Sequence, residues 1–213
     1  MNLSLGAEDD GRPDNPVRAA CRKAVADYGI DVIASAGNQG PGMTTVTMPA
    51  CDPQVIAVGG IQTLGELAIW EKSSRGPTVE GHTKPDFVLW ATDIEAASHS
   101  DDEKYLVKSG TSFSAPLLSG LTGLLWESGR RAYGEAWEFH WYDMVRFAPY
   151  FSTKPRDAPV EKDNTYGYGL PAMGAWLAEL SGVKSAGAEA MEMIVPLMAM
   201  AMVAVMMPAV TGG

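Results

Sequence analysis

Short apolar runs and one amphipathic stretch alternate along the first part of the chain. The run from Ile30 to Ala36 is rich in branched side chains, which is typical of a buried parallel strand, and residues 1–6 predict a shorter strand before it. Between them, apolar residues recur at helical spacing after Pro16, which suits a first helical position, and Gly29 can end that helix. A strand, a helix and a strand in succession predict an α/β fold with a parallel sheet.

Further short apolar runs predict more strands downstream. They are Gln54 to Gly59, Phe87 to Trp90, Ile94 to Ala97 and Tyr105 to Lys108, with one or two more within Gly60 to Ile69. Residues 71–86 predict a loop. Residues 111–127 have a helical pattern that is apolar on nearly every side, and such a helix is expected in the middle of a domain. Two shorter helices are expected, one near residues 140–147 and one that begins at Pro171 and runs to residue 180.

The character of the chain changes after residue 180. Residues 181–192 are mostly small and polar, so they predict a linker that follows a domain over residues 1–180. Residues 193–210 carry no charge, and as a helix they would span roughly 27 Å, close to the thickness of a bilayer core. We expect a membrane-spanning helix there. A buried or disordered hydrophobic tail and a partner-facing helix are the alternatives.

Composition narrows the classes of function. The chain has 213 residues, of which 46% are hydrophobic and 20% are charged, as expected for one globular domain with an appendage. The net charge of −10 and the lack of a Lys and Arg cluster argue against a nucleic-acid partner. The two cysteines, Cys21 and Cys51, allow one disulfide at most, and their spacing matches no metal motif. We therefore expect two unpaired or buried thiols.

Ser112 is the first candidate for chemistry. It lies within the segment from Ser109 to Pro116, where Gly110 allows a sharp turn just before the apolar helix begins. A serine at a helix N-terminus lies beside unpaired backbone N–H groups and the positive end of the helix dipole, which can stabilise a negative oxygen on a substrate carbonyl. Taken alone, a Gly-Thr-Ser sequence at a helix start is more often a plain N-cap.

Asn38 is the second candidate, at the end of the buried strand that contains Ala34, Ser35 and Ala36. An Asn between glycines is usually a turn former. Its side-chain amide is also the donor that a tetrahedral intermediate needs beside a backbone N–H. Ser112 and Asn38 together favour a nucleophile with an oxyanion hole over two unrelated structural residues.

Several blocks of the sequence resemble the subtilisin-like (S8) serine proteases over residues 1–180. They follow one another in the family's order: Asn2-Leu3-Ser4-Leu5-Gly6, Ala36-Gly37-Asn38, Val55-Ile56-Ala57-Val58-Gly59, Ser73-Ser74-Arg75-Gly76-Pro77, Lys84-Pro85-Asp86, Ser109 to Pro116, and Tyr166-Gly167-Tyr168-Gly169-Leu170. One such block is a weak signal, but the ordered series is a strong one. The resemblance implies the C-terminal half of a subtilisin-like catalytic domain, with a parallel sheet.

The resemblance also implies a role for each candidate. Ser112 would attack the scissile carbonyl of a polypeptide substrate, and Asn38 with the Ser112 backbone N–H would hold the oxyanion. The substrate-binding candidates are Ser4, Leu5 and Gly6, which would pair with the substrate backbone as an added strand, and Ser35, Ala36 and Gly37, which would line the primary specificity pocket. Pro49 resembles a family proline often preceded by a cis bond. Calcium is a family cofactor, although this sequence offers no confident ligand cluster for it.

Two departures from the family concern the catalytic machinery. The chain contains no Asp-Thr-Gly block and no His-Gly-Thr block, which in the family precede everything seen here. We expect His82, His99 and His140 to be surface or structural residues. Leu117 and Leu118 follow Pro116 where the family usually has a histidine, and residues 90–92 replace an Ala-Pro-Gly segment. Because loss of the histidine lowers kcat of subtilisin by about 10⁶, we expect almost no activity from this chain alone.

Three functions remain open. The first is a piece of a serine endopeptidase whose missing N-terminal half supplies Asp and His. The second is a non-catalytic pseudoprotease module, anchored to a membrane, that binds peptides or a partner. The third is a membrane-anchored structural protein whose main feature is its tail. The intact Gly-Thr-Ser block favours the first, with the domain outside the cytoplasm and held to a membrane by residues 193–210.

Overall fold

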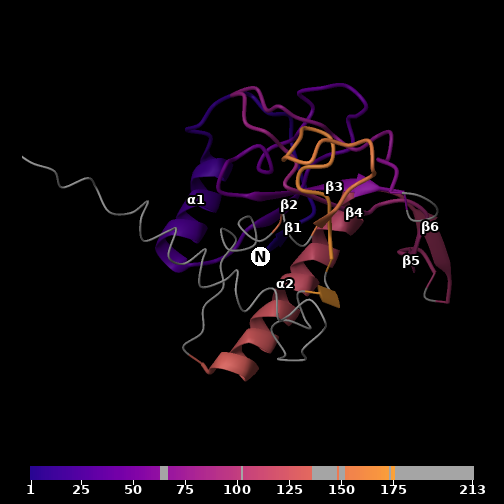
Figure 1. Ribbon diagram of the computed structural model, residues 1–213. Helices are drawn as coiled ribbons and strands as arrows, with labels where there is room; N and C mark the ends of the chain where they lie inside the picture. Colours follow the sequence, from indigo (N-terminus) through magenta and orange to yellow (C-terminus); the bar gives the residue numbers. More distant parts are fainter. Residues whose placement is uncertain (63–66, 102, 136–147, 149–151, 173, 176–213) are drawn as a thin grey trace, which may run out of the picture.

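The computed structural model describes residues 1–62, 67–101, 103–135, 148, 152–172 and 174–175. Its centre is a parallel sheet of four strands in the order β1-β2-β3-β4 (Figure 1). The strands are β1 (Asn2–Leu3), β2 (Ile33–Ser35), β3 (Ile56–Ile61) and β4 (Phe87–Trp90). The predicted α/β class with a parallel sheet is confirmed.

Strand boundaries differ from the predicted ones where the chain leaves the sheet. β1 ends at Leu3 rather than at residue 6, because Ser4 turns toward the helix that contains Ser112. There the Oγ of Ser4 donates to the carbonyl of Ser112 at 2.9 Å. β3 begins and ends two residues later than predicted, since Ile61 still pairs with Trp90 of β4. Ile69 makes only an isolated antiparallel bridge to Ile61, so the further strand predicted before Ile69 does not form among the described residues of that segment.

Helix α1 (Pro16–Tyr28) begins and ends where its sequence signals predict. The Oδ1 of Asn15 accepts the backbone N–H of Val17 at 3.0 Å, which satisfies one of the free donors of the first turn. Gly29 closes the helix with a φ of 60°, the left-handed conformation that a glycine adopts without steric cost. The capped helix thus connects β1 to β2 in the predicted βαβ unit.

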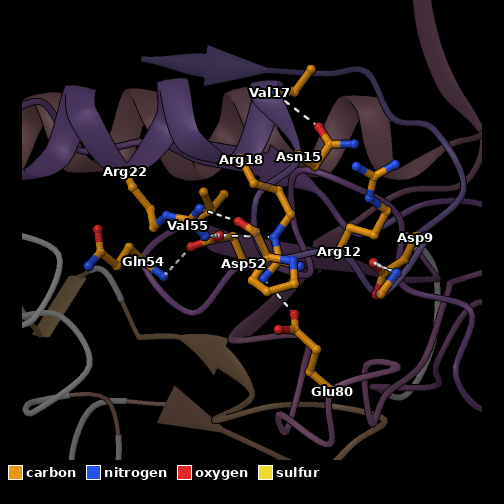
Figure 2. Close-up of polar contacts among 12 residues, drawn as sticks. Asp9, Arg12, Asn15, Val17, Arg18, Arg22, Asp52, Gln54, Val55 and Glu80 are labelled. Carbon is orange, nitrogen blue, oxygen red and sulfur yellow. Dashed lines mark hydrogen bonds and ion pairs between the residues drawn. The ribbon is translucent and has the colours of Figure 1, made fainter.

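A buried ionic network fixes α1 to the turn before β3 (Figure 2). The Nε of Arg18 lies 3.0 Å from Oδ2 of Asp52, and its Nη2 lies 2.5 Å from Oε2 of Glu80. The Nη1 of Arg22 lies 2.7 Å from the same Asp52 oxygen. Asp52 also accepts the backbone N–H of Gln54 at 3.0 Å, so both of its oxygens are paired. Because Arg18 and Asp52 are buried, each needs the other's charge.

Helix α2 (Thr111–Tyr133) packs across the sheet and contacts β1, β2, β3 and β4 (Figure 1). It is longer than the predicted range of 111–127, and Arg130 and Arg131 lie in its last turn, where cations suit the helix dipole. The expectation of a helix buried on nearly every side is wrong for the described part of the structure. Only one face packs on the sheet, while Leu117 and Leu124 are 40% and 52% exposed.

Two clusters of buried side chains cover the two faces of the sheet. One joins the sheet to α2 and contains Ile33, Ile56, Val58, Phe87, Leu89, Ala115, Leu118, Leu125 and Ala148. The other joins the sheet to α1 and contains Cys21, Val32, Ala34, Val46, Ala50, Cys51, Val55 and Ala57. Consecutive residues of β2 alternate between the clusters, as a pleated strand requires. Both thiols are free and buried, which confirms the prediction for the cysteines.

The segment after residue 151 corrects a second prediction. Pro171 does not begin a helix: it lies in β8 (Leu170–Pro171), which pairs antiparallel with β7 (Ser152–Thr153). The chain stays extended there because Gly169 accepts the backbone N–H of Val88 at 3.1 Å, so pairing with β4 overrides the local signal. The helix predicted at 140–147, the linker at 181–192 and the hydrophobic segment at 193–210 lie outside the described residues.

Asp86 fixes this C-terminal segment to the sheet. Its Oδ2 accepts the backbone N–H of Ala57 at 2.7 Å and lies 2.6 Å from Nζ of Lys84, while its Oδ1 lies 2.6 Å from Nζ of Lys162. Burial alone would raise the pKa of Asp86, but the two ammonium groups lower it below its usual value. Burial lowers the pKa of Lys84, and the charge of Asp86 offsets part of that effect. Gly167 packs against the Asp86 carbonyl so closely that no Cβ fits.

The remaining elements do not contribute to the central sheet. Strands β5 (Ile94–Ala97) and β6 (Tyr105–Lys108) have the predicted bounds and form a separate antiparallel pair. Residues 71–86 form the predicted loop. In the described part of the chain, no helix combines the length and the apolar character that crossing a membrane requires.

Candidate active site

The candidate residues meet where β1 and β2 end beside the N-terminus of α2. A small pocket of about 110 Å³ lies at this point. It is lined by Leu5, Gly6, Ser35, Gly37, Asn38, Gln39, Thr47, Thr111 and Ser112. The structure therefore gathers six of the eight predicted site residues around one cavity. Of the other two, Ser4 bonds to Ser112, whereas Ala36 is fully buried behind the pocket wall.

Ser112 is the second residue of α2, after the N-cap Gly110. At this position its backbone N–H is one of the four donors that have no acceptor within the helix. Its Oγ donates a long hydrogen bond of 3.5 Å to the carbonyl of Ser4, and the Oγ of Ser4 donates in return to the Ser112 carbonyl at 2.9 Å. The hydroxyl of Ser112 is partly accessible and only weakly held, as a nucleophile must be.

Thr111 fixes the orientation of the Asn38 side chain. The Oδ1 of Asn38 accepts the backbone N–H of Thr111 at 3.0 Å and its hydroxyl at 2.9 Å. Because a backbone N–H can donate only to the oxygen of the amide, the Nδ2 of Asn38 must point the other way. This nitrogen lies 3.5 Å from where a Cβ of Gly110 would stand, close to the start of α2. A side-chain donor and a helix N-terminus thus converge beside Ser112.

Three residues of the pocket were not singled out in the sequence as site residues. Thr111 is fully buried, and its hydroxyl oxygen, whose proton is donated to Asn38, accepts the backbone N–H of Gly37 at 3.2 Å. The Oε1 of Gln39 accepts the backbone N–H of Asn38 at 2.8 Å and the hydroxyl of Ser74 at 3.0 Å. Thr47 enters from another part of the chain. Adjacency to Asn38 and Ser112 could have suggested the first two, but no sequence signal indicates Thr47.

The pocket contains no charged side chain among its nine lining residues. His82 lies in the turn that follows Thr78, where its backbone N–H donates to the threonine hydroxyl at 3.1 Å. His99 lies between β5 and β6, and His140 is outside the described residues. In the part of the chain that the structure describes, the pocket lining therefore includes the Ser112 hydroxyl and the Asn38 amide but no imidazole.

The described residues offer no group of three or more His, Cys, Asp or Glu side chains that could hold a metal ion. Calcium binding, which the resemblance implies, therefore stays a prediction for which the described residues show no set of ligands. Met48 and Pro49 are joined by a cis peptide bond, as the resemblance implies for this proline.

The sequence and the fold of this chain were compared with those of known proteins. The model of the subtilase family, Peptidase_S8, matches residues 1–169. Serine protease AprX of Bacillus subtilis is 30% identical over 145 residues, which cover 59% of this chain and 33% of AprX. Subtilisin-like protease SBT6.1 of Arabidopsis thaliana is 35% identical over 131 residues, and membrane-bound transcription factor site-1 protease of Mus musculus is 32% identical over the same length.

These proteins are much longer than the region they share with this chain. The matched region covers 12% of each of the last two proteins, so the chain spans a third or less of these relatives. Among solved structures, Sphericase superposes with a TM-score of 0.60 at 20% identity, covering 79% of this chain and 55% of Sphericase. At that identity the superposition shows the shared fold alone.

Proposed function

Since this chain belongs to the subtilase family of serine peptidases, we propose that it is the nucleophile-bearing part of a serine endopeptidase. The observation that carries the proposal is the clamp between Thr111 and Asn38, which turns the Asn38 amide nitrogen toward the start of α2. A plain N-cap serine would need no such second donor. An oriented amide beside a free helix N-terminus is the arrangement that stabilises a tetrahedral oxyanion.

The reaction would proceed through an acyl-enzyme on Ser112. The Ser112 Oγ would attack the scissile carbonyl carbon while its proton passes to a histidine supplied from outside the described residues. The carbonyl oxygen, now negative, would accept hydrogen bonds from the Asn38 Nδ2 and the Ser112 backbone N–H. The C–N bond would then break as the histidine returns the proton to the leaving amine. A water molecule would then give a proton to the histidine and attack the acyl carbon. The histidine would return that proton to the Ser112 Oγ as the bond between Ser112 and the acyl group breaks.

The substrate is a polypeptide that binds as an additional strand. Residues 4–6 leave the sheet at the pocket, and the chain only resumes pairing at Ala7, which bonds to Met48 in both directions at 3.0 and 2.8 Å. An extended peptide could pair with the backbone of residues 4–6 and bring one carbonyl to Ser112. Ser35, Ala36 and Gly37 would then form the wall of the primary specificity pocket.

The missing catalytic residues would come from an N-terminal half that covers an unpaired side of the molecule. In the described residues no strand pairs with the outer edge of β1, and such edges are normally covered. The pocket lies next to this edge, since Ser4, the residue that follows β1, exchanges hydrogen bonds with Ser112. A segment that extended the sheet from β1 would therefore lie beside the pocket, and its Asp and His would complete the site.

A second candidate is a non-catalytic module that binds peptides or a partner and is anchored to a membrane by residues 193–210, with its domain outside the cytoplasm. Two features favour it: residues 4–6 leave backbone groups at the pocket with which a peptide could pair, and the pocket lining contains no imidazole in the described part of the chain. In this case Ser112 would be dispensable, and removal of residues 185–213 would change the location of the protein but not its affinity for peptides.

Hydrolysis of a fluorogenic casein distinguishes the two candidates. The full chain would be assayed alone and with a polypeptide that carries the Asp- and His-bearing half of a subtilase domain, with Ser112→Ala as the matched control. We expect almost no hydrolysis by the chain alone, and turnover in the mixture that Ser112→Ala abolishes. If a folded complex forms but stays inactive, and peptides bind the wild-type chain and Ser112→Ala equally, the binding module is the better account.

A further inference from the structure

Ser74 is fully buried against the segment that carries Asn38. It belongs to the block from Ser73 to Pro77, which so far has no part in the proposed reaction. The Ser74 backbone N–H donates to the Gly37 carbonyl at 3.0 Å, and its Oγ accepts the Gln39 backbone N–H at 3.1 Å. Ser74 thus bonds to the residues on both sides of Asn38.

The side chain of Gln39 extends this contact to Asn38 itself. Its Oε1 accepts the Ser74 hydroxyl at 3.0 Å and the Asn38 backbone N–H at 2.8 Å. Gln39 is an exposed residue, so without the serine hydroxyl its side chain could turn into solvent and release the Asn38 N–H. Ser74 therefore holds the backbone of Asn38 through Gln39.

Gly37 allows the two segments to approach this closely. A Cβ at this position would stand 2.7 Å from the Ser74 Oγ and 2.6 Å from the Gln39 Oε1, and its φ of 112° also suits glycine. The contact continues at Gly40, whose backbone N–H donates to the Lys72 carbonyl at 3.0 Å. Residues 37–40 are therefore anchored on residues 72–74.

The place of the Asn38 amide nitrogen depends on this anchor as well as on Thr111. Thr111 makes both of its bonds to the Oδ1 of Asn38, which fixes one end of the side chain. The other end is the Asn38 Cα, and the backbone of residues 37–40 sets its position. Both ends must be held for the Nδ2 to keep one direction, and a misplacement of about 1 Å can slow an enzyme about 100-fold.

We propose that Ser74 is a positioning residue for the oxyanion donor. Through Gln39 and the Asn38 backbone, it keeps the Asn38 Nδ2 directed at the carbonyl that Ser112 attacks. The inference rests on the proposed function, because it takes the Asn38 amide as that donor. Ser74 does not line the pocket, so its effect on turnover would pass through Asn38.

Two neighbouring serines provide a variant and its matched control. Ser74→Ala removes the hydroxyl and keeps the backbone bond to Gly37. Ser73 is buried to the same extent, but its Oγ accepts the backbone N–H of Gly60 in β3. Ser73→Ala therefore also removes one buried hydroxyl, but not one that bonds to the segment of Asn38. Urea unfolding of both variants would establish that each is folded.

Amide hydrogen exchange of the full chain alone, followed by NMR, tests the contact itself. We expect Ser74→Ala to lose protection at the Asn38 and Gln39 N–H groups, because the first loses its fixed acceptor and the second loses the serine oxygen. Ser73→Ala should leave the protection of both groups unchanged. Unchanged protection in Ser74→Ala would mean that Ser74 does not hold this segment, and the inference would be overturned whatever the activity.

Steady-state kinetics with fluorogenic casein, in the complex with the Asp- and His-bearing half, test the consequence. We expect Ser74→Ala to lower kcat by about tenfold with KM nearly unchanged, because a misplaced donor should cost less than the factor of about 10²–10³ for a missing one. Ser73→Ala should keep the wild-type kcat. In the Asn38→Ala background, Ser74→Ala should lower kcat no further, since no amide is left to position.

The double variant separates positioning from a general effect on the fold. An equal loss of kcat on adding Ser74→Ala to the wild-type chain and to Asn38→Ala would show that Ser74 does not act through Asn38. That result, or an unchanged kcat in Ser74→Ala, would overturn the inference and leave the proposed function standing. A folded wild-type complex without turnover would instead overturn the proposed function, and the inference with it.

Discussion

At the scale of the residue, two hydrogen bonds from Thr111 determine how the Asn38 side chain is oriented. Asn38 could serve as a turn former, but Thr111 gives both a backbone N–H and a hydroxyl to its oxygen. Those two bonds commit the amide nitrogen to the side where Ser112 lies. In the proposed reaction Thr111 is a positioning residue: it is buried, and its two bonds hold the Asn38 amide in place.

Asn38→Ala is expected to lower kcat of the complete enzyme far more than it raises KM. In the proposed mechanism the amide donates to the oxyanion, which exists only in the transition state and intermediate, so loss of the amide would affect turnover rather than binding. Subtilisin loses about 10²–10³ in kcat when its equivalent donor is removed, and we expect a similar factor here. Steady-state kinetics of the complex between this chain and the Asp- and His-bearing half provide the measurement. A KM effect with unchanged kcat would argue against an oxyanion role.

Cys51 should be inert in the folded protein. Burial, followed by the nearby negative charge of Asp9, raises the pKa of this thiol to about 12, so almost no thiolate exists at pH 8. Cys21 is also buried, and its pKa is raised by burial. Iodoacetamide at pH 8 should modify neither cysteine in the native chain and both after unfolding in guanidinium chloride, as measured by mass spectrometry. Rapid modification of the native chain would contradict this packing.

At the scale of the element, α1 and α2 differ in how they are held. α1 is short and its buried face is small, so the ion pairs of Arg18 and Arg22 with Asp52 supplement its apolar contacts. α2 is held by an apolar face against four strands, and Leu117 and Leu124 on its outer side are exposed in the described structure. The first helix is therefore held partly by charge, and the second mainly by apolar contacts.

Asp52→Ala is expected to destabilise the domain by about 3–5 kcal/mol, because it leaves the Arg18 guanidinium buried without its main partner. The matched control is Asp101→Ala, which breaks the exposed pair with Lys104 and should leave the unfolding midpoint almost unchanged. Urea unfolding followed by circular dichroism measures both. Similar midpoints for the two variants would mean that the buried network contributes little to stability.

The sequence could predict the elements whose signals are local. The cap residues of α1, the bounds of β4, β5 and β6, and the start of α2 all follow from nearby residues. The helix predicted to begin at Pro171 was wrong. A proline suits a helix start, but residues 169–171 pair with β4 and β7 instead. The resemblance to the subtilases predicts that Asn38 and Ser112 share a site, but Thr47 reaches the pocket only through tertiary packing. Such a contact leaves no local pattern.

At the scale of the whole molecule, the described residues pack on both faces of one parallel sheet. Both faces of β2 and β3 are buried, and Asp86 connects the loop before β4, the strand β3 and the C-terminal segment. The candidate pocket, in contrast, lies beside β1, whose outer edge pairs with no strand among the described residues.

The role of Asp86 predicts how stability depends on pH. Its folded-state pKa lies below the usual value of 3.8, so its stabilising contribution is complete above that value and is lost as the pH falls toward the folded-state pKa. The unfolding midpoint in urea should drop between pH 5 and pH 2 for the wild-type chain, and less steeply for Asp86→Asn. Parallel pH profiles for the two proteins would show that another carboxylate controls the acid transition.

The most direct test of the central claim is labelling of Ser112 by a fluorophosphonate probe. The full chain would be labelled alone and in complex with a polypeptide that carries the Asp- and His-bearing half of a subtilase domain, with Ser112→Ala as control. We predict slow or no labelling of the chain alone, fast labelling in the complex, and none with Ser112→Ala. A folded complex that labels no faster than the chain alone, or that labels equally with Ser112→Ala, would contradict the assignment of Ser112 as the nucleophile of a divided active site.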